Sequence, residues 1–175
     1  MKEMLRYGLV LAIICIVAVV LLAGMNSLTK GRILQQARAE EEISLKEVMP
    51  DAQRFEPVKS GEDIIYYKAY NNAGKLIGFA FKASGKGYSS TIETMVGMLK
   101  DGTITAIKVL SQNETPGLGS RVAEPDFTGQ FKNAKDLHDI QAVTGASISS
   151  RAVIDSVQKK AQKIMTLIKA EGEVY

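Results

Sequence analysis

Residues 91–110 read TIETMVGMLKDGTITAIKVL and predict a β-hairpin. Apolar and β-branched residues dominate both arms, and the Asp101-Gly102 pair between them is a strong two-residue turn signal. Alternation along the second arm, 103–110, places Ile104 and Ala106 on the same face. The stretch therefore predicts two antiparallel strands of a sheet.

A second strand pair precedes this hairpin. Residues 64–70 are rich in β-branched and aromatic residues, the segment 71–74 (NNAG) supplies a turn, and 76–82 follows as the partner strand. The sequence thus predicts a sheet of four antiparallel strands. Their predicted bounds are 64–70, 76–82, 91–99 and 103–110.

The last predicted element is an amphipathic helix from about Ile148 to Ala170. Apolar residues recur there at spacings of three and four, with charged and polar residues between them. The apolar positions are Ile154, Val157, Ala161, Ile164 and Ile168. A helix of this kind packs on a sheet, so the fold class is α+β.

The N-terminal segment has the length and composition of a membrane span. The chain carries no charge from Tyr7 through Thr29, and about 20 helical residues match the hydrocarbon core of a bilayer. A cleaved signal peptide has a shorter apolar core, and a lipoprotein needs a cysteine after the run, whereas Cys15 lies inside it. We expect a retained transmembrane anchor over residues 1–29.

The anchor leads into a charged segment that is rich in helix formers. We expect residues 30–50 to form a solvated helical stalk, closed by Pro50, and residues 51–175 to form the folded domain. Basic residues occur on both sides of the span, so the positive-inside rule does not decide its orientation. They are Lys2, Arg6, Lys30, Arg32 and Arg38.

Composition argues against several functions. The net charge is +3, and no basic face with interleaved aromatic residues supports nucleic-acid binding. One histidine, His138, and one cysteine in the apolar run make a His/Cys metal site or a Cys-His nucleophile improbable. We therefore expect no catalytic residue and no metal site.

Small residues before the last helix point to a different chemistry. Thr144-Gly145-Ala146-Ser147 permits a tight turn and places Ser147 as the predicted N-cap of that helix. A phosphate attached to this hydroxyl would face free N–H groups and the positive end of the helix dipole. A serine-rich cap alone needs no cofactor, so the motif requires its context.

That context is a loop between the last strand and this turn. Within the aperiodic segment 111–130, residues 114–119 read ETPGLG, and Pro116-Gly117 suits the central positions of a type II turn. Such a turn can present backbone N–H groups to a ring system while Leu118 covers an apolar edge. An ordinary surface turn is the alternative for Thr-Pro-Gly alone.

Together, TGASISSRAV and ETPGLG resemble the RnfG family, the FMN-binding component of the Rnf complex, and its relative in the Na⁺-pumping NADH:quinone oxidoreductase. Gly85-Lys86-Gly87-Tyr88 is similar to a glycine-containing segment of the same domains. The resemblance spans nearly the whole chain. It implies that FMN is esterified through its phosphate to Ser147 by a flavin transferase that uses FAD. The further cofactor-binding residues that it implies are Thr144, Gly145, Ala146, Glu114, Thr115, Gly117, Leu118, Gly119, Gly87 and Tyr88.

The resemblance also implies a function and a location. The chain is expected to carry electrons in a ferredoxin:NAD oxidoreductase complex that moves Na⁺ or H⁺, with its domain outside the cytoplasmic membrane. Expected partners are the other membrane subunits, including a second flavin carrier. The family often has an acidic residue where this chain has Gln141. The alternatives are the equivalent protein of the quinone oxidoreductase, a membrane-anchored module with a noncovalent ligand, and a pilin-like protein, whose processing site is missing before the span.

Overall fold

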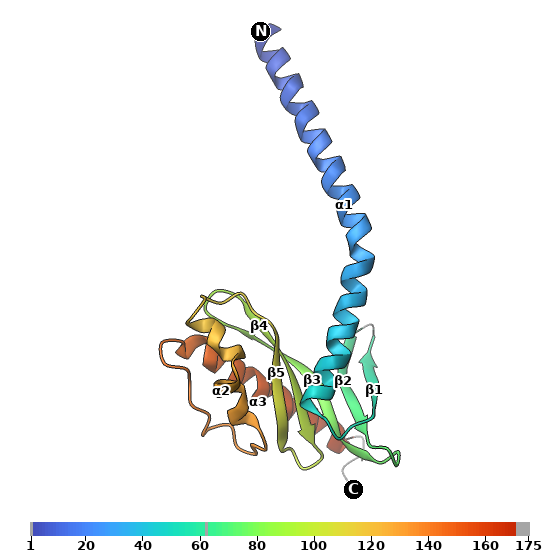
Figure 1. Cartoon of the computed structure of the whole chain (residues 1–175), viewed down its shortest axis with the longest axis vertical. Coiled ribbons are helices and arrows are strands. Elements are labelled where there is room, and N and C mark those ends of the chain that lie inside the picture. Colours follow the sequence, from blue (N-terminus) through green and yellow to red (C-terminus); the bar gives the residue numbers. More distant parts are fainter. Residues whose placement is uncertain (1, 62, 171–175) are drawn as a thin grey trace. The chain divides into compact units, whose positions relative to one another are not determined.

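The computed structural model describes residues 2–61 and 63–170, which form an α+β fold (Figure 1). The chain divides into two compact units between Glu42 and Ile43. Helix α1 (Lys2–Val48) runs through this division, so its first part makes up one unit and its last turns belong to the other. The predicted fold class is confirmed.

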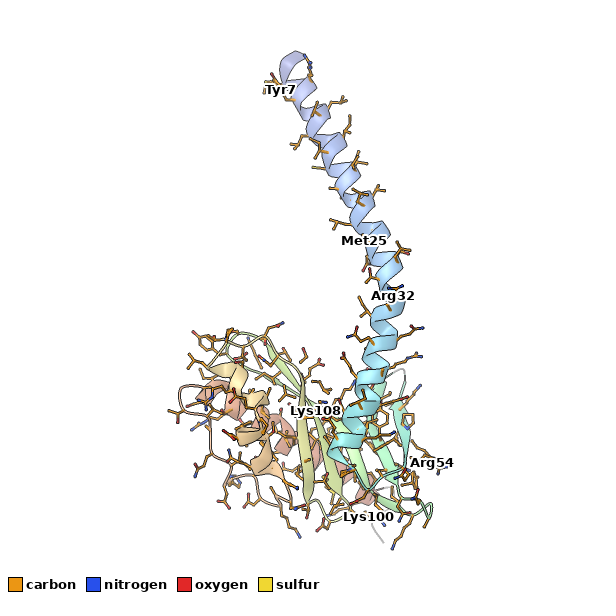
Figure 2. The ribbon with its side chains drawn as sticks, viewed as in Figure 1. Tyr7, Met25, Arg32, Arg54, Lys100 and Lys108 are labelled. Carbon is orange, nitrogen blue, oxygen red and sulfur yellow. The ribbon has the colours of Figure 1, made fainter. Side chains whose placement is uncertain are left out.

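The first unit is the long apolar part of α1. Its large apolar side chains from Tyr7 to Met25, the two residues that mark the ends of this run in Figure 2, are exposed. Among the described residues, α1 is the one helix long and apolar enough to cross a membrane. Such a helix satisfies its backbone polar groups internally, as a bilayer requires.

The second unit contains a sheet of five antiparallel strands in the order β1-β2-β3-β4-β5. The strands are β1 (Arg54–Ser60), β2 (Asp63–Tyr70), β3 (Leu76–Lys86), β4 (Thr91–Leu99) and β5 (Ile104–Ser111). The prediction of four strands was wrong by one, because β1 was missed. Pro57 interrupts its strand pattern, and proline is tolerated at an edge, where β1 pairs only with β2.

The hairpin of β4 and β5 differs in detail from its prediction. Four residues join the strands, and the N–H group of Gly102, whose φ is +89°, donates to the carbonyl of Leu99. In β5, Ala106 pairs with Gly97 and Ile104 with Met98, which leaves Thr105 as an extra, bulged residue. Ile104 therefore lies in a different apolar cluster from Ala106, although simple alternation predicted one face for both.

One face of the sheet is covered by α3 (Ser147–Ala170), as predicted for the last helix (Figure 1). Short helices in the long connection complete this side: η1 (Gly119–Ala123), α2 (Pro125–Thr128) and η2 (Gly129–Phe131). Their buried side chains, Val122, Phe127 and Phe131, join the core beneath α3. The larger of the two apolar clusters lies here and positions the start of α3.

The opposite face of the sheet receives the end of α1. Leu45, Val48 and Met49 are at most 3% exposed in the second apolar cluster, so this end of the predicted stalk is not solvated. Glycines 78 and 97 make room for it, because a Cβ on Gly78 would lie 2.8 Å from Cε of Met49 and one on Gly97 would meet the carbonyl of Val48. The packed unit thus begins at Ile43, and the anchor, stalk and domain bounds stay a prediction.

Candidate functional site

A cavity of about 470 Å³ opens at the start of α3. Eight of the eleven predicted cofactor-binding residues line it, although they come from three separate parts of the sequence. The lining residues are Tyr88, Glu114, Thr115, Leu118, Gly119, Gly145, Ala146, Ser147, Ile148 and Ser149. Sequence reasoning did not find Ile148 and Ser149, although helical geometry places them in the turn that Ser147 begins. The predicted residues Gly87, Gly117 and Thr144 are not part of the lining.

The turn before α3 presents Ser147 to this cavity. Gly145 has φ +83°, and the N–H group of Ala146 donates to the carbonyl of Val143 over 2.9 Å. The first helical hydrogen bond runs from the N–H group of Ser150 to the carbonyl of Ala146. Ala146 is therefore the N-cap and Ser147 the first helical residue, which corrects the prediction that Ser147 caps the helix.

The three serines of this turn differ in exposure. Ser149 and Ser150 are at most 2% exposed, whereas Ser147 is exposed. The Ser150 hydroxyl donates to the carbonyl of Ala146 and accepts from the N–H group of Val143. The Ser149 hydroxyl donates to the carboxylate of Glu114 over 2.6 Å. Of these three serines, Ser147 is the exposed one, and it lines the cavity.

The helix start favours an anion. Within residues 2–61 and 63–170, the N–H groups of Ser147, Ile148 and Ser149 have no protein acceptor. Free N–H groups and the positive end of the helix dipole stabilise a phosphate. Arg151 is exposed one turn further along α3 and adds a positive charge nearby in sequence.

The ETPGLG loop forms the predicted type II turn. Gly117 has φ +75°, and the N–H group of Leu118 donates to the carbonyl of Thr115 over 3.2 Å. The N–H group of Gly117 donates to the Ser120 hydroxyl. These two N–H groups are thus used inside the loop. The expectation that the turn offers its N–H groups to a ligand is therefore wrong for both of them. Leu118, at 48% exposed, offers an apolar surface.

Glu114, the first residue of this loop, is buried, with 6% of its surface exposed. Burial by itself would raise the pKa of its carboxyl, but hydrogen bonds from the Ser149 hydroxyl and from the N–H groups of Ser90, Ser89 and Tyr88 outweigh it. The pKa of Glu114 therefore lies below its ordinary value, and the group is a carboxylate at neutral pH.

Comparisons with known proteins cover both units. The FMN-binding domain family matches residues 87–162, and the RnfG N-terminal region matches residues 1–48. The chain is 32% identical to the G component of the ion-translocating oxidoreductase complex of Methanosarcina acetivorans, over 89% of this chain and 92% of the relative. The chain belongs to the RnfG family.

Two further relatives in the RnfG family carry more specific names. The chain is 29% identical to the G component of the proton-translocating ferredoxin:NAD(+) oxidoreductase complex of Clostridium ljungdahlii, over 89% of each chain. It is also 29% identical to the G component of the Na(+)-translocating ferredoxin:NAD(+) oxidoreductase complex of Acetobacterium woodii, over 96% of this chain and 95% of the relative. The apolar helix and these relatives support a membrane-anchored protein.

The fold has a counterpart among solved structures. The crystal structure of NqrC from Shewanella oneidensis matches with a TM-score of 0.54 and 22% identity, over 70% of this chain and 74% of that one. This likeness confirms the fold of the domain in this member of the RnfG family.

The residues at the cavity of this RnfG family member fit an FMN group. A volume of about 470 Å³ is within the range of small-molecule sites, roughly 300–1,000 Å³. Leu118, Ile148 and Tyr88 are exposed apolar or aromatic side chains suited to a ring system, and the start of α3 suits a phosphate. The polar part of the cavity thus suits the phosphate of FMN, and the apolar part suits its ring system.

Titratable side chains are few in the cavity lining. The titratable lining residues are Tyr88 and Glu114, and both oxygens of Glu114 already accept hydrogen bonds. Over the described ranges 2–61 and 63–170, no group of three His, Cys, Asp or Glu side chains could hold a metal ion.

Proposed function

We propose that this chain carries FMN, linked through its phosphate to Ser147, and acts as the electron-carrying subunit of a membrane-bound ion-translocating ferredoxin:NAD oxidoreductase complex. The observation that supports this most directly is the exposed Ser147 hydroxyl, at the first residue of α3, in a cavity lined by the region that matches the FMN-binding domain family. The names of the relatives support the complex.

The chain's own residues have separate tasks in this proposal. Bound FMN would supply a redox group that takes up and releases one or two electrons. The N–H groups at the start of α3 hold the phosphate, while Leu118, Ile148 and Tyr88 provide apolar surface for the ring. A covalent bond keeps the cofactor in place when the surrounding solution contains little of it.

Attachment of this kind is a substitution at phosphorus in which the serine is the nucleophile. Oγ of Ser147 would form a new bond to the FMN phosphorus of FAD, and the bond from that phosphorus to the AMP part would break. AMP would leave, and the serine proton would pass to a base. Because the carboxylate of Glu114 is occupied by hydrogen bonds, we assign this base to the flavin transferase.

The proposal covers either coupling ion, since the chain is equally identical to a relative named for protons and to one named for Na⁺. It also includes the other proteins of the complex as partners. Purification of the tagged chain from its membrane identifies them: components of a ferredoxin:NAD oxidoreductase support the proposal, whereas components of a NADH:quinone oxidoreductase would reassign the chain to that complex.

Flavin content after Ser147→Ala tests the attachment site. The full chain is co-expressed with a flavin transferase, denatured and inspected for flavin fluorescence in the gel. We expect a fluorescent wild-type band, no fluorescence for Ser147→Ala, and retention of flavin for Ser147→Thr, because threonine keeps the hydroxyl.

Ser156→Ala is the matched control, since Ser156 lies on the same helix and its hydroxyl donates to the carbonyl of Val153, outside the cavity lining. It should remain fluorescent. A wild-type band without fluorescence, beside a related protein that fluoresces, would favour a noncovalent ligand-binding module. Normal flavin content in Ser147→Ala would exclude Ser147 as the attachment point.

A further inference from the structure

The carboxylate of Glu114 has an unusual number of partners for a side chain next to a binding cavity. Its Oε1 accepts from the N–H groups of Ser89 and Ser90 over 3.0 and 2.9 Å, and from the Ser90 hydroxyl over 3.4 Å. Its Oε2 accepts from the N–H group of Tyr88 over 3.1 Å and from the Ser149 hydroxyl over 2.6 Å. Both oxygens are thus occupied within the protein.

These partners lie in different segments of the cavity wall. Residues 88–90 connect β3 to β4, Glu114 begins the ETPGLG loop, and Ser149 is in the first turn of α3. Each segment contributes to the lining. One buried carboxylate therefore connects all three walls, and the hydrogen bonds to it are of the strong, charge-assisted kind.

Two glycines leave the space that this carboxylate fills. A Cβ on Gly87 would lie 2.6 Å from Oε1 of Glu114, and one on Gly119 would lie 2.9 Å from Oε2 and 2.9 Å from Oγ of Ser149. Neither glycine has a positive φ, so neither is required by the backbone conformation. The close approach of the Glu114 carboxylate explains why both positions are glycine.

The same hydrogen bonds separate the serines at the start of α3. Because the Ser149 hydroxyl donates to Glu114 and Ser149 is buried, this hydroxyl is engaged within the protein, whereas Ser147 stays exposed. Loss of the carboxylate would free Ser149 and release residues 88–90 from the wall. The position of the acceptor hydroxyl thus depends on a residue that does not itself react.

We propose that Glu114 is a positioning residue, whose carboxylate holds the three walls of the cavity together and presents Ser147, rather than Ser149, for attachment of FMN. This inference rests on the proposed function. It differs from the expectation that Glu114 contacts the cofactor directly.

Glu114→Gln is the decisive variant because it keeps the size of the side chain. The amide has one oxygen where the carboxylate has two, and its NH₂ group would face donors. An unsatisfied buried donor lowers the equilibrium constant for the arrangement in which the three walls are joined by about tenfold. Glu124→Gln is the matched control, since Glu124 is exposed and its carboxylate pairs only with Arg121.

The full chain and both variants are co-expressed with a flavin transferase, and the tryptic peptide 136–151 is analysed for the adduct. We expect wild type and Glu124→Gln to carry FMN on Ser147 in equal yield, and the yield of Glu114→Gln to fall about tenfold. The visible circular dichroism per bound flavin, which reports how the ring is held and not how much protein is folded, should decrease in Glu114→Gln alone.

Hydrogen–deuterium exchange on the same chains without transferase separates this inference from the proposed function. The amides of residues 88–90 should exchange faster in Glu114→Gln than in wild type. In Glu124→Gln they should exchange at the wild-type rate. If wild type carries no flavin, the proposed function fails, and with it the role of Glu114 in presenting Ser147; faster exchange would then support only the connection of the walls. If Glu114→Gln matches wild type in flavin yield, in visible circular dichroism and in the exchange of residues 88–90, the positioning role of Glu114 is overturned.

Discussion

At the first turn of α3, three serines close together in sequence have different surroundings. Ser149 and Ser150 are buried and hydrogen-bonded, and Ser147 is exposed to the cavity. We propose Ser147 as the attachment point, and the burial of Ser149 and Ser150 gives a physical reason for that choice. The Ser149 hydroxyl donates to Glu114, which is 35 positions away in the chain and was not predictable as its neighbour.

The lowered pKa of Glu114 predicts how acid acts on the chain. A carboxyl whose pKa is lower in the folded state stabilises that state above its ordinary value of 4.5, and this contribution is lost as pH falls through the lower, folded value. The melting temperature of wild type should therefore exceed that of Glu114→Gln by a constant amount near neutral pH, and the difference should narrow below pH 4.5.

Thermal unfolding of both chains between pH 7 and pH 3 measures this difference. All other carboxyl groups are common to the two chains, so their titration cancels. Glu124→Gln should follow wild type throughout. A gap between wild type and Glu114→Gln that stays the same into the acid range would show that the Glu114 carboxylate is not preferentially stabilised in the folded state.

Among the elements, the end of α1 departs most from its prediction. A charged helical segment after a membrane span suggests a solvated stalk, but Leu45, Val48 and Met49 pack on the sheet face opposite α3. The Thr105 hydroxyl also donates to the carbonyl of Val48, and Lys108 pairs with Glu47 over 2.7 Å. These turns of α1 are part of the folded unit.

Leu45→Ala tests this packing against Ile43→Ala on the same helix. Leu45 is 3% exposed, and its truncation should lower the free energy of unfolding by about 2–5 kcal/mol. Ile43 is 54% exposed, and its truncation should change that free energy by no more than about 0.5 kcal/mol. Denaturant unfolding of the detergent-solubilised chain gives both values; equal small losses would mean that the helix end does not stabilise the domain.

For the chain as a whole, the resemblance to the RnfG family leads us to propose that the folded unit lies on the outer side of the cytoplasmic membrane. A reporter that is active only outside, fused after Tyr175, should therefore be active, and one that is active only inside should be silent. The flanking charges do not decide the orientation, so this measurement carries information that they lack. The opposite pattern would place the flavin domain in the cytoplasm and contradict the proposed location.

Local sequence by itself determined much of this protein. The length of the uncharged run predicted the apolar helix, residue types and turn signals predicted β2 to β5, and periodicity predicted α3, because each signal lies within a short segment. The turn at Pro116-Gly117 followed from the allowed φ of two residues. The motifs predicted most residues of one cavity before their proximity was known.

Only the tertiary structure decided the remaining features, because they depend on residues far apart in the chain. β1 is a strand since β2 offers it a partner at the sheet edge, and Thr105 bulges where β5 pairs with β4. Leu45 is buried because glycines on β3 and β4 admit the end of α1. The carboxylate of Glu114 lies among its five donors only once three segments have come together, and no local pattern contains that information.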